Sequence, residues 1–461
     1  MYLTRKIDKW LSNWKEKAKH VPALVCGIRQ CGKTTSIKMF GEKYYKNIVY
    51  MNFWTNPSYI SIFDGDLDVD EVISKISLRF PNIFIDAQNT LFFLDEIQEC
   101  PKARLFFKDV ANDGRYDFIG SGSFLGLSGY NVGDGTPIPT GYEDIVYMKT
   151  MDFEEFLWAN KYTESHIEVI EKFFIERRPV DTSIHELFKK LYNQYLCVGG
   201  FPEAVSTFIE THNLMESLRV VKKNMDEIMS DFGRRVDKDG NPLFKPNEVA
   251  RIRNAFEQIP VFLAKENKRY IVSKIETGSG TEKNRAIDYL QQINVVYKVY
   301  NLELPSIPLK GNEISSQFKL FPTDISILTS MYGTETIAAL NQGNLGQKKG
   351  AIYEALVLDS LYKADVDAFY FAKESGLEID FVICYNANCY LVEAKAKNGN
   401  TKSAKTVMNN KNHYGQTKLL KIGDYNVGEV GDILTIPHYM VFLLGRKKDL
   451  IVEDLSNKAL R

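Results

Sequence analysis

Residues 23–35 read Ala-Leu-Val-Cys-Gly-Ile-Arg-Gln-Cys-Gly-Lys-Thr-Thr, an apolar run that leads through a turn to the start of a helical pattern. The second part of this stretch matches G-x-x-x-x-G-K-[ST], the pattern of a loop that cradles phosphate with its backbone N–H groups. Glycines let such a loop curl tightly, and the N-terminus of the following helix adds partial positive charge. The stretch therefore predicts a phosphate-binding loop between a strand and a helix.

The polar residues of this loop have separate expected roles. Lys33 would reach the β- and γ-phosphates of a nucleotide, and the hydroxyl of Thr34 would hold Mg²⁺. The expected ligands are therefore ATP, or ADP, together with Mg²⁺. The residues expected to contact the nucleotide are Gly27, Ile28, Arg29, Gln30, Cys31, Gly32, Lys33, Thr34 and Thr35.

A second motif lies at residues 91–96, Leu-Phe-Phe-Leu-Asp-Glu, where four apolar residues run into two acidic ones. The pattern is typical of a buried parallel strand that ends in a Walker B motif. Asp95 would hold Mg²⁺ through water, and Glu96 would act as the general base that polarises the attacking water. Ser121, at the tip of the next predicted strand, would sense the γ-phosphate; a turn serine bonded to its own backbone is the alternative.

Five apolar runs separated by helical patterns predict a three-layer α/β P-loop NTPase domain with a parallel sheet, over residues 1–150. Asp68 is expected to cap the helix that follows it. The five runs are residues 23–26, 47–53, 91–96, 116–120 and 145–149.

The rest of the chain predicts three further domains. Residues 151–236 carry apolar residues at helical spacing and predict a helical lid. Residues 237–342 show helices followed by two strands, which suggests a winged-helix-like domain; a connecting scaffold is the alternative. Residues 343–461 mix helical and strand patterns, with a last strand expected at residues 439–444, and predict a small α/β domain.

Two neighbouring strands of this last domain carry acidic and basic residues. Asp380 lies in one strand, and Glu393 and Lys395 share a face of the next, because side chains alternate along a strand. Asp380 and Glu393 could coordinate a divalent metal, with Lys395 to orient or deprotonate water for attack on a phosphodiester. Residues 394–423 contain lysines and no acidic residue, which would suit a phosphate backbone. An ordinary surface strand with alternating charges is the alternative.

Length, charge and cysteine content limit the kind of protein that this chain can be. The chain has 461 residues, 44% of them hydrophobic and 25% charged, which indicates a folded protein of more than one domain. The net charge of −1 favours no class of partner for the whole chain. Six scattered cysteines without metal-site spacing favour free thiols in a reducing compartment, and no apolar run approaches 18 residues. We expect a cytoplasmic protein without a membrane segment; oligomerisation stays open.

The motifs, taken in order, resemble those of a family of bacterial and archaeal AAA-type ATPases that carry a C-terminal domain of uncharacterised function. This resemblance implies a winged helix followed by a domain similar to the PD-(D/E)xK, or restriction-endonuclease-like, nuclease fold. It places Glu354, as a further metal ligand, beside Asp380, Glu393 and Lys395 at nuclease-like positions. The matching stretches are residues 27–35, 94–98, 122–123, 153–156, 199–203, 318–324, 378–381 and 393–395.

The chain also departs from this family. Where the family usually has a Gly-Arg pair before a Pro-Leu-Ser-Phe stretch, this sequence reads Thr140-Gly141-Tyr142, and Lys149-Thr-Met-Asp-Phe153 replaces the proline run. An arginine that could sense the nucleotide is therefore missing. Three functions stay open: an ATPase that acts on DNA through its C-terminal half, a nucleotide-gated binding or scaffold protein with an inactive nuclease-like domain, and an ATP-regulated, metal-dependent DNA nuclease.

Overall fold

The computed structural model describes residues 1–123, 141–233, 242, 244–265, 268–272, 284–341, 349–395 and 401–446. The chain divides into two compact units, each with its own sheet. Unit 1 contains Met1–Thr150, Ser230–Val249 and Gln292–Asn294. Unit 2 contains Met151–Met229, Ala250–Gln291 and Val295–Arg461. The domain boundaries predicted at residues 237 and 343 lie outside the described residues.

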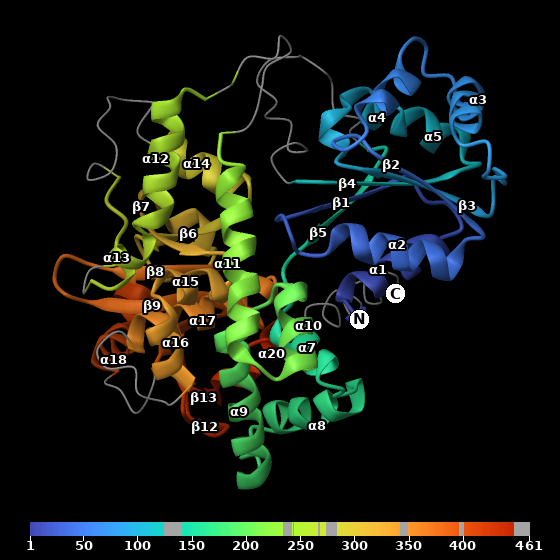
Figure 1. The fold of residues 1–461 in the computed structure, drawn as a ribbon. Coiled ribbons are helices and arrows are strands. Elements are labelled where there is room, and N and C mark those ends of the chain that lie inside the picture. Colours follow the sequence, from blue (N-terminus) through green and yellow to red (C-terminus); the bar gives the residue numbers. More distant parts are fainter. Residues whose placement is uncertain are drawn as a thin grey trace. The chain divides into compact units, whose positions relative to one another are not determined.

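The sheet of unit 1 has five parallel strands in the order β2-β3-β4-β1-β5, so the predicted parallel sheet is confirmed. Every residue of β1 and β3 is buried, as expected for central strands covered on both faces. Figure 1 shows helices on both faces of this sheet, which gives the three predicted layers. The strands are β1 (Ala23–Gly27), β2 (Asn47–Asn52), β3 (Thr90–Asp95), β4 (Asp117–Gly122) and β5 (Asp144–Met148).

The helices of unit 1 follow local sequence signals. In α1 (Lys6–Glu16) the apolar stripe at helical spacing is buried, and its members are Ile7, Leu11 and Trp14. The carboxylate of Asp68 accepts a hydrogen bond from the N–H of Glu71, so the predicted helix cap is confirmed. In Figure 1, α1 and α2 lie on one face of the sheet and the others on the opposite face. The helices after α1 are α2 (Lys33–Tyr44), α3 (Val69–Arg79), α4 (Pro101–Leu105) and α5 (Phe107–Asp113).

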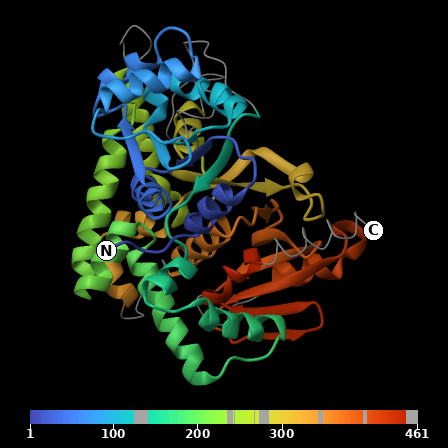
Figure 2. The ribbon, with the colours of Figure 1, turned by 90° about the vertical axis from the view of Figure 1, so that its right-hand side faces the viewer.

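Unit 2 contains an eight-stranded mixed sheet in the order β12-β13-β11-β10-β9-β8-β6-β7, drawn mostly in orange and red in Figure 2. The hairpin of β6 and β7, which we predicted as part of a winged helix, joins this sheet through a parallel pairing of Asn301 with Tyr370. The winged helix itself stays a prediction. The strands are β6 (Val296–Leu302), β7 (Glu313–Pro322), β8 (Ala368–Ala372), β9 (Glu378–Tyr385), β10 (Asn388–Ala394), β11 (Thr417–Gly423), β12 (Gly428–Val430) and β13 (Ile433–Pro437).

The other α-helices of the described chain all follow β5. The region predicted as a helical lid is helical throughout its regular elements. These helices are α7 (Phe153–Ala159), α8 (Glu164–Ile175), α9 (Thr182–Val198), α10 (Pro202–Thr211), α11 (Leu214–Ser230), α12 (Pro246–Glu257), α13 (Ile259–Leu263), α14 (Arg285–Gln292), α15 (Ile325–Met331), α16 (Thr334–Asn341), α17 (Lys349–Lys363), α18 (Lys402–Asn409), α19 (Lys411–Tyr414) and α20 (Leu443–Arg446).

The prediction of a last strand at residues 439–444 is wrong. This segment forms a 3-10 turn at His438–Met440 and continues into α20. Every side chain from Tyr439 to Leu444 is buried. A short, wholly apolar run has no period to distinguish a buried strand from a buried helix, and here the helical form is the one that packs.

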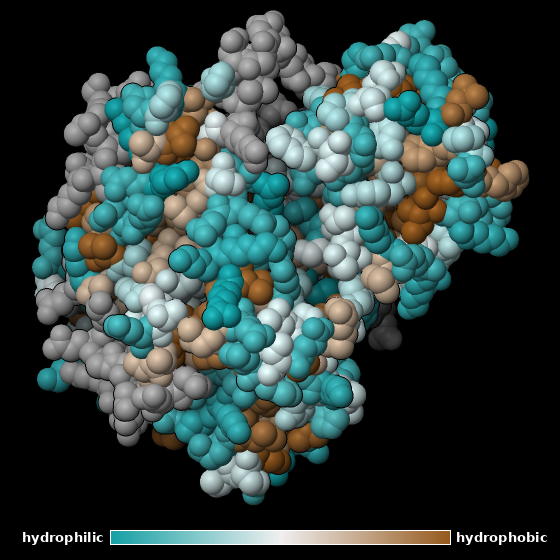
Figure 3. Space-filling model, in the orientation of Figure 1, coloured by the Kyte–Doolittle hydropathy of each residue, from teal (hydrophilic) through white to brown (hydrophobic). Residues whose placement is uncertain are grey.

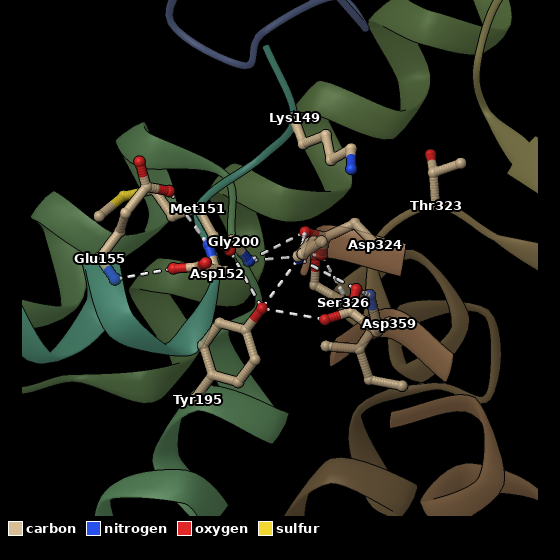
Figure 4. Close-up of polar contacts among 12 residues, drawn as sticks. Lys149, Met151, Asp152, Glu155, Tyr195, Gly200, Thr323, Asp324, Ser326 and Asp359 are labelled. Atoms are coloured by element: carbon tan, nitrogen blue, oxygen red, sulfur yellow. Dashed lines mark hydrogen bonds and ion pairs between the residues drawn. The ribbon is translucent and has the colours of Figure 1, made fainter. Parts of the chain in front are cut away.

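A buried polar network joins three helices of unit 2, and Figure 4 shows its side chains converging. The ammonium of Lys363, at the end of α17, lies 2.8 Å from a carboxylate oxygen of Asp324 and 3.0 Å from one of Asp359. It also donates to the hydroxyl of Tyr195 on α9, at 2.8 Å. The two carboxylates and the ammonium are at most 1% exposed, so Lys363 provides their charge compensation within the protein.

The same network holds the first residue of unit 2. The N–H of Met151 donates to the carbonyl of Gly200 at 2.7 Å, and the hydroxyl of Tyr195 donates to the carbonyl of Met151 at 3.0 Å. The N–H of Gly200 donates in turn to Asp324, at 3.1 Å. Asp359 accepts from Tyr195 at 3.0 Å (Figure 4). The chain therefore enters unit 2 through hydrogen bonds to a fixed ionic network.

We expect the stability of unit 2 to depend on pH through Asp359, whose pKa burial raises to about 6 despite the nearby Lys363. Because this folded-state pKa lies above that of an unfolded aspartic acid, the free energy of unfolding should fall as the pH rises through it. In Asp359→Asn this loss should be smaller by roughly 1–2 kcal/mol between about pH 5 and pH 7. Urea unfolding of both proteins at several pH values measures the difference.

The asparagine variant preserves the hydrogen bonds of this position. Its carbonyl oxygen can accept from the N–H of Ile325, which donates to Asp359 at 3.0 Å, while its amide can donate to Tyr195. The change therefore removes a charge without removing the contacts. Parallel pH profiles of the two proteins would contradict the assignment.

Within the described ranges, no helix is both long enough and apolar enough to span a bilayer. Figure 3 shows hydrophobic residues scattered in small groups among hydrophilic ones on the face in view. The most exposed large hydrophobic side chains among the described residues include Leu78, Phe84 and Val430.

Candidate functional sites

The predicted phosphate-binding loop connects the end of β1 to the start of α2. Gly32 precedes the helix in the left-handed conformation, with φ of 97°, which favours glycine. At Gly27 a side chain would clash, because a Cβ atom there would lie 2.3 Å from the carbonyl oxygen of Met148 on β5. The two glycines of the motif are therefore required by the geometry of the loop.

Lys33 folds back over this loop. Its ammonium donates to the carbonyl oxygens of Gly27 and Ile28, at 3.0 Å in both cases, and the residue is 9% exposed. A positive charge is thereby fixed inside the loop, at the N-terminus of α2. This is the place at which a phosphate group would meet both the charge and the helix terminus.

Arg5 braces the loop from outside. Its guanidinium donates to the carbonyl of Cys31 in the loop and to the carbonyl of Lys149 just after β5, at 2.7 Å each. The residue is 4% exposed. Nothing in the local sequence pattern around Arg5 indicates the contact.

Asp95, at the end of β3, accepts hydrogen bonds from several polar side chains around it. One of its carboxylate oxygens accepts from the hydroxyl of Thr34 at 3.0 Å. The same oxygen accepts from Tyr50 at 2.9 Å and from the amide of Asn52 at 3.2 Å. Its other oxygen accepts from the hydroxyl of Ser121. The structure therefore brings together the residues predicted for Mg²⁺, Thr34 and Asp95, and adds two donors from β2 that the sequence analysis missed.

These residues fit a magnesium ion. Mg²⁺ prefers hard oxygen ligands, and the hydroxyl of Thr34 and the carboxylate of Asp95 lie side by side at the end of the sheet. Burial raises the pKa of Tyr50 to about 12, so this residue remains a neutral donor to Asp95. Asn52 and Tyr50 thus orient the carboxylate without changing its charge.

Glu96 follows Asp95 in the left-handed conformation, with φ of 53°. The turn takes its carboxylate out of the strand, and the side-chain amide of Gln98 donates to it at 2.5 Å. The residue that we predicted as general base is thus held by a neighbour two positions along the chain. Gln98 belongs to the motif quoted above, but the sequence analysis gave it no role.

Ser121 is completely buried on β4. Its hydroxyl is directed at Asp95, so it helps to position the Walker B carboxylate. The predicted contact of Ser121 with a γ-phosphate stays a prediction.

A second group of charged residues lies in unit 2, on β9 and β10. The ammonium of Lys395 lies 3.2 Å from Asp380 and 2.8 Å from Glu393, so the three residues predicted from their spacing meet in space. Asp380 also accepts from the N–H of Ala394 at 2.9 Å. The antiparallel pairing of β9 with β10 brings the two carboxylates together.

Glu354, on α17, makes different contacts from those that we expected. One of its oxygens pairs with the ammonium of Lys319 on β7 at 3.1 Å, and the other pairs with Lys268. Lys319 also pairs with Glu378 on β9, at 3.2 Å. We refer to these residues as the acid–lysine cluster. Its members are Lys268, Lys319, Glu354, Glu378, Asp380, Glu393 and Lys395.

The carboxylates of this cluster respond differently to burial. Burial and the nearby Asp380 raise the pKa of Glu393 to about 7. Burial also raises the pKa of Asp380. Burial alone would raise the pKa of Glu354, but Lys319 and Lys268 outweigh it and lower this pKa. Glu354 is therefore a permanent carboxylate at neutral pH, compensated by lysines.

Residues 19–157 match the family model described as an AAA domain. The AAA domain thus covers the loop, the Walker B strand and the whole five-stranded sheet. Two further matches, at residues 189–338 and 349–439, are to domains of unknown function, DUF8612 and DUF4143. No curated protein matches the sequence.

Several solved structures are similar to this chain. ORC2 of Aeropyrum pernix, in ADPNP–ADP complexes, is 11% identical, with a TM-score of 0.39 over 75% of this chain and 95% of ORC2. RuvB of Thermotoga maritima is 15% identical, with a TM-score of 0.29 over 65% of this chain and 90% of RuvB. AMPPCP-bound DnaA from Aquifex aeolicus is 12% identical, with a TM-score of 0.24 over 61% of this chain and 74% of DnaA. These similarities are distant.

Thr34 and Asp95 fit a divalent cation, but the residues of the acid–lysine cluster do not. Both oxygens of Glu354 are paired with lysines. Among the described residues, no group of three or more His, Cys, Asp or Glu side chains is placed to hold a metal ion. Asp380 and Glu393 are already bridged by Lys395. The nuclease-like roles of these residues stay predictions.

Proposed function

We propose that this protein binds ATP together with Mg²⁺ in its AAA domain and hydrolyses the nucleotide. The observation that carries the proposal is the direct contact between Thr34 of the loop and Asp95 of the Walker B strand, 3.0 Å apart, with the ammonium of Lys33 fixed in the same loop. An arrangement of this kind holds nucleotide phosphates and their magnesium ion in P-loop proteins.

Each residue of the site has a separate task in this proposal. Lys33 neutralises phosphate charge, and Thr34 and Asp95 would hold Mg²⁺, which supplies further charge neutralisation when it is bound. Glu96 accepts a proton from the attacking water or orients it. Gln98 fixes the carboxylate of Glu96 in place through its amide.

Replacing Glu96 with glutamine tests the hydrolytic part of this proposal. Glutamine has the same shape but cannot accept the proton, so kcat for ATP should fall by roughly 100-fold or more, while ATP binding stays within about twofold of the wild type. Steady-state phosphate release and a fluorescent-nucleotide titration measure the two quantities. Glu99→Gln, an exposed glutamate next to the same turn, serves as the control and should leave both unchanged.

The outcomes separate two classes of function. If Glu96→Gln hydrolyses ATP at the wild-type rate, Glu96 is not the general base. If the wild type binds ATP and releases no phosphate, the AAA domain does not hydrolyse ATP and the bound nucleotide acts only as a switch.

We further propose that the C-terminal half acts on the target of the protein, and that this target is DNA. Exposed lysines on α18 and α19 support this proposal, because residues 394–423 contain no acidic residue to oppose them. Phosphate backbones are bound by clusters of this kind. The described members are Lys402, Lys405 and Lys411, with Lys418 and Lys421 partly exposed on β11.

A second candidate function is a nucleotide-gated binding platform, whose nuclease-like domain does not cut. The pairing of Glu354 with Lys268 and Lys319 favours this candidate over an ATP-regulated nuclease. A carboxylate already compensated by two ammonium groups has little tendency to bind a metal ion.

A further inference from the structure

Lys319 lies at the centre of the acid–lysine cluster, although the spacing of the acidic residues in the sequence does not predict its presence there. It is 1% exposed, on β7, and its ammonium contacts Glu354 at 3.1 Å and Glu378 at 3.2 Å. A buried ammonium is stable only when carboxylates surround it, and a buried carboxylate requires a positive counter-charge. Lys319 and Glu354 therefore require each other.

The charges of the cluster nearly balance without any added ion. Three lysines face four carboxylates, and every carboxylate has an ammonium within 3.2 Å or in direct contact. The remaining negative charge falls on Glu378, whose side chain is 41% exposed and is therefore stabilised by solvent. A divalent cation would add two positive charges to a nearly neutral site.

We propose that the ammonium groups of Lys268 and Lys319 take the place of a divalent cation in this cluster, so that the protein keeps the carboxylates of a metal site and binds no metal at Glu354. This inference goes beyond ATP hydrolysis and is independent of it. It defines the cluster as a fixed, internally neutralised element.

Lys268 is the replaceable member of the pair. Its side chain is 17% exposed, while that of Lys319 is 1% exposed. Removing the charge of Lys268 frees one oxygen of Glu354 and leaves Lys319 in place. The cluster then carries more negative charge close to Asp380 and Glu393, which is the condition for binding a divalent cation.

Titration of the full-length protein with Mn²⁺, in the absence of nucleotide, tests the proposal. The free Mn²⁺ is followed by its electron paramagnetic resonance signal. Lys268→Met should take up one more Mn²⁺ than the wild type, or bind it at least about tenfold more tightly, and the double variant Lys268→Met/Glu354→Gln should lose this gain. Lys265→Met, an exposed lysine nearby, is the matched control and should resemble the wild type.

Glu354→Gln in the otherwise wild-type chain gives an independent reading that does not depend on the lysine variant. Under the proposal it leaves Mn²⁺ uptake unchanged, since Glu354 binds no cation. A loss of uptake in Glu354→Gln would overturn the proposal, and so would a Lys268→Met protein that folds and gains no cation. If Lys268→Met folds poorly, Lys268→Gln removes the same charge with a polar side chain.

Plasmid DNA provides the functional arm of the test. With Mg²⁺ or Mn²⁺ the wild type should leave the plasmid intact. Cleavage by the wild type that disappears in Asp380→Ala would also overturn the proposal. None of these results depends on ATP turnover, so failure here and failure of the proposed ATPase function are distinguishable.

Discussion

Lys33→Ala should weaken ATP binding by about 100-fold or more, because its ammonium lies inside the loop, on the carbonyl oxygens of Gly27 and Ile28. Removing one partner of a desolvated charge pair costs roughly 2–5 kcal/mol, which corresponds to factors of this size. Isothermal titration with ATP and Mg²⁺ measures the affinity. ATP hydrolysis should fall in parallel at any nucleotide concentration below saturation.

The control for this change is Lys43→Ala, an exposed lysine on the same helix α2. It should bind ATP as the wild type does. A thermal melt without nucleotide shows whether Lys33→Ala retains its fold, since the change also removes two hydrogen bonds to loop carbonyls. Unchanged ATP affinity in a folded Lys33→Ala protein would refute the nucleotide site itself.

Lys363→Met is expected to cause the largest loss of stability among the changes considered. The methionine fills the space of the lysine but leaves Asp324 and Asp359 buried without a counter-charge. Breaking a buried ion pair by removing one partner costs roughly 3–5 kcal/mol. The effect should appear in unit 2, as faster hydrogen exchange in α9, α15 and α17, measured by mass spectrometry.

Two comparisons make this prediction specific. Lys190→Met alters an exposed lysine on α9 and should leave exchange unchanged. Adding Asp359→Asn to Lys363→Met removes one of the two uncompensated charges and should recover part of the lost stability. Equal exchange rates in Lys363→Met and the wild type would show that the network does not stabilise the unit.

The AAA domain was the most predictable part of the chain, because its signals are local. The loop after β1 and the acidic end of β3 are continuous stretches, and each carries its own strand or helix context. The carboxyl ends of parallel strands lie at the same edge of a sheet, so the loop after β1, with Thr34, and Asp95 at the end of β3 were expected at one edge. The capping role of Asp68 was equally local.

The second sheet was less predictable. Asp380, Glu393 and Lys395 were found because a short turn joins β9 to β10, which makes their pairing a local matter. The strands β11 to β13 were not predicted, and residues 439–444 were assigned to a strand in error. The pairing of β6 with β8 joins segments about 70 residues apart, and no sequence period reports such a contact.

The sequence by itself determined the strand, loop and helix of the proposed nucleotide site, the parallel sheet that carries them and the meeting of three charged residues on β9 and β10. Only the tertiary structure decided which charges compensate which. Lys319 and Lys268 reach Glu354 across 35 and 86 residues of the chain, and Lys363 meets Asp324 across 39. Ion pairs of this kind depend on which elements pack together. The spacing of residues in the sequence indicates which positions are buried, but not which distant residue a buried charge will pair with.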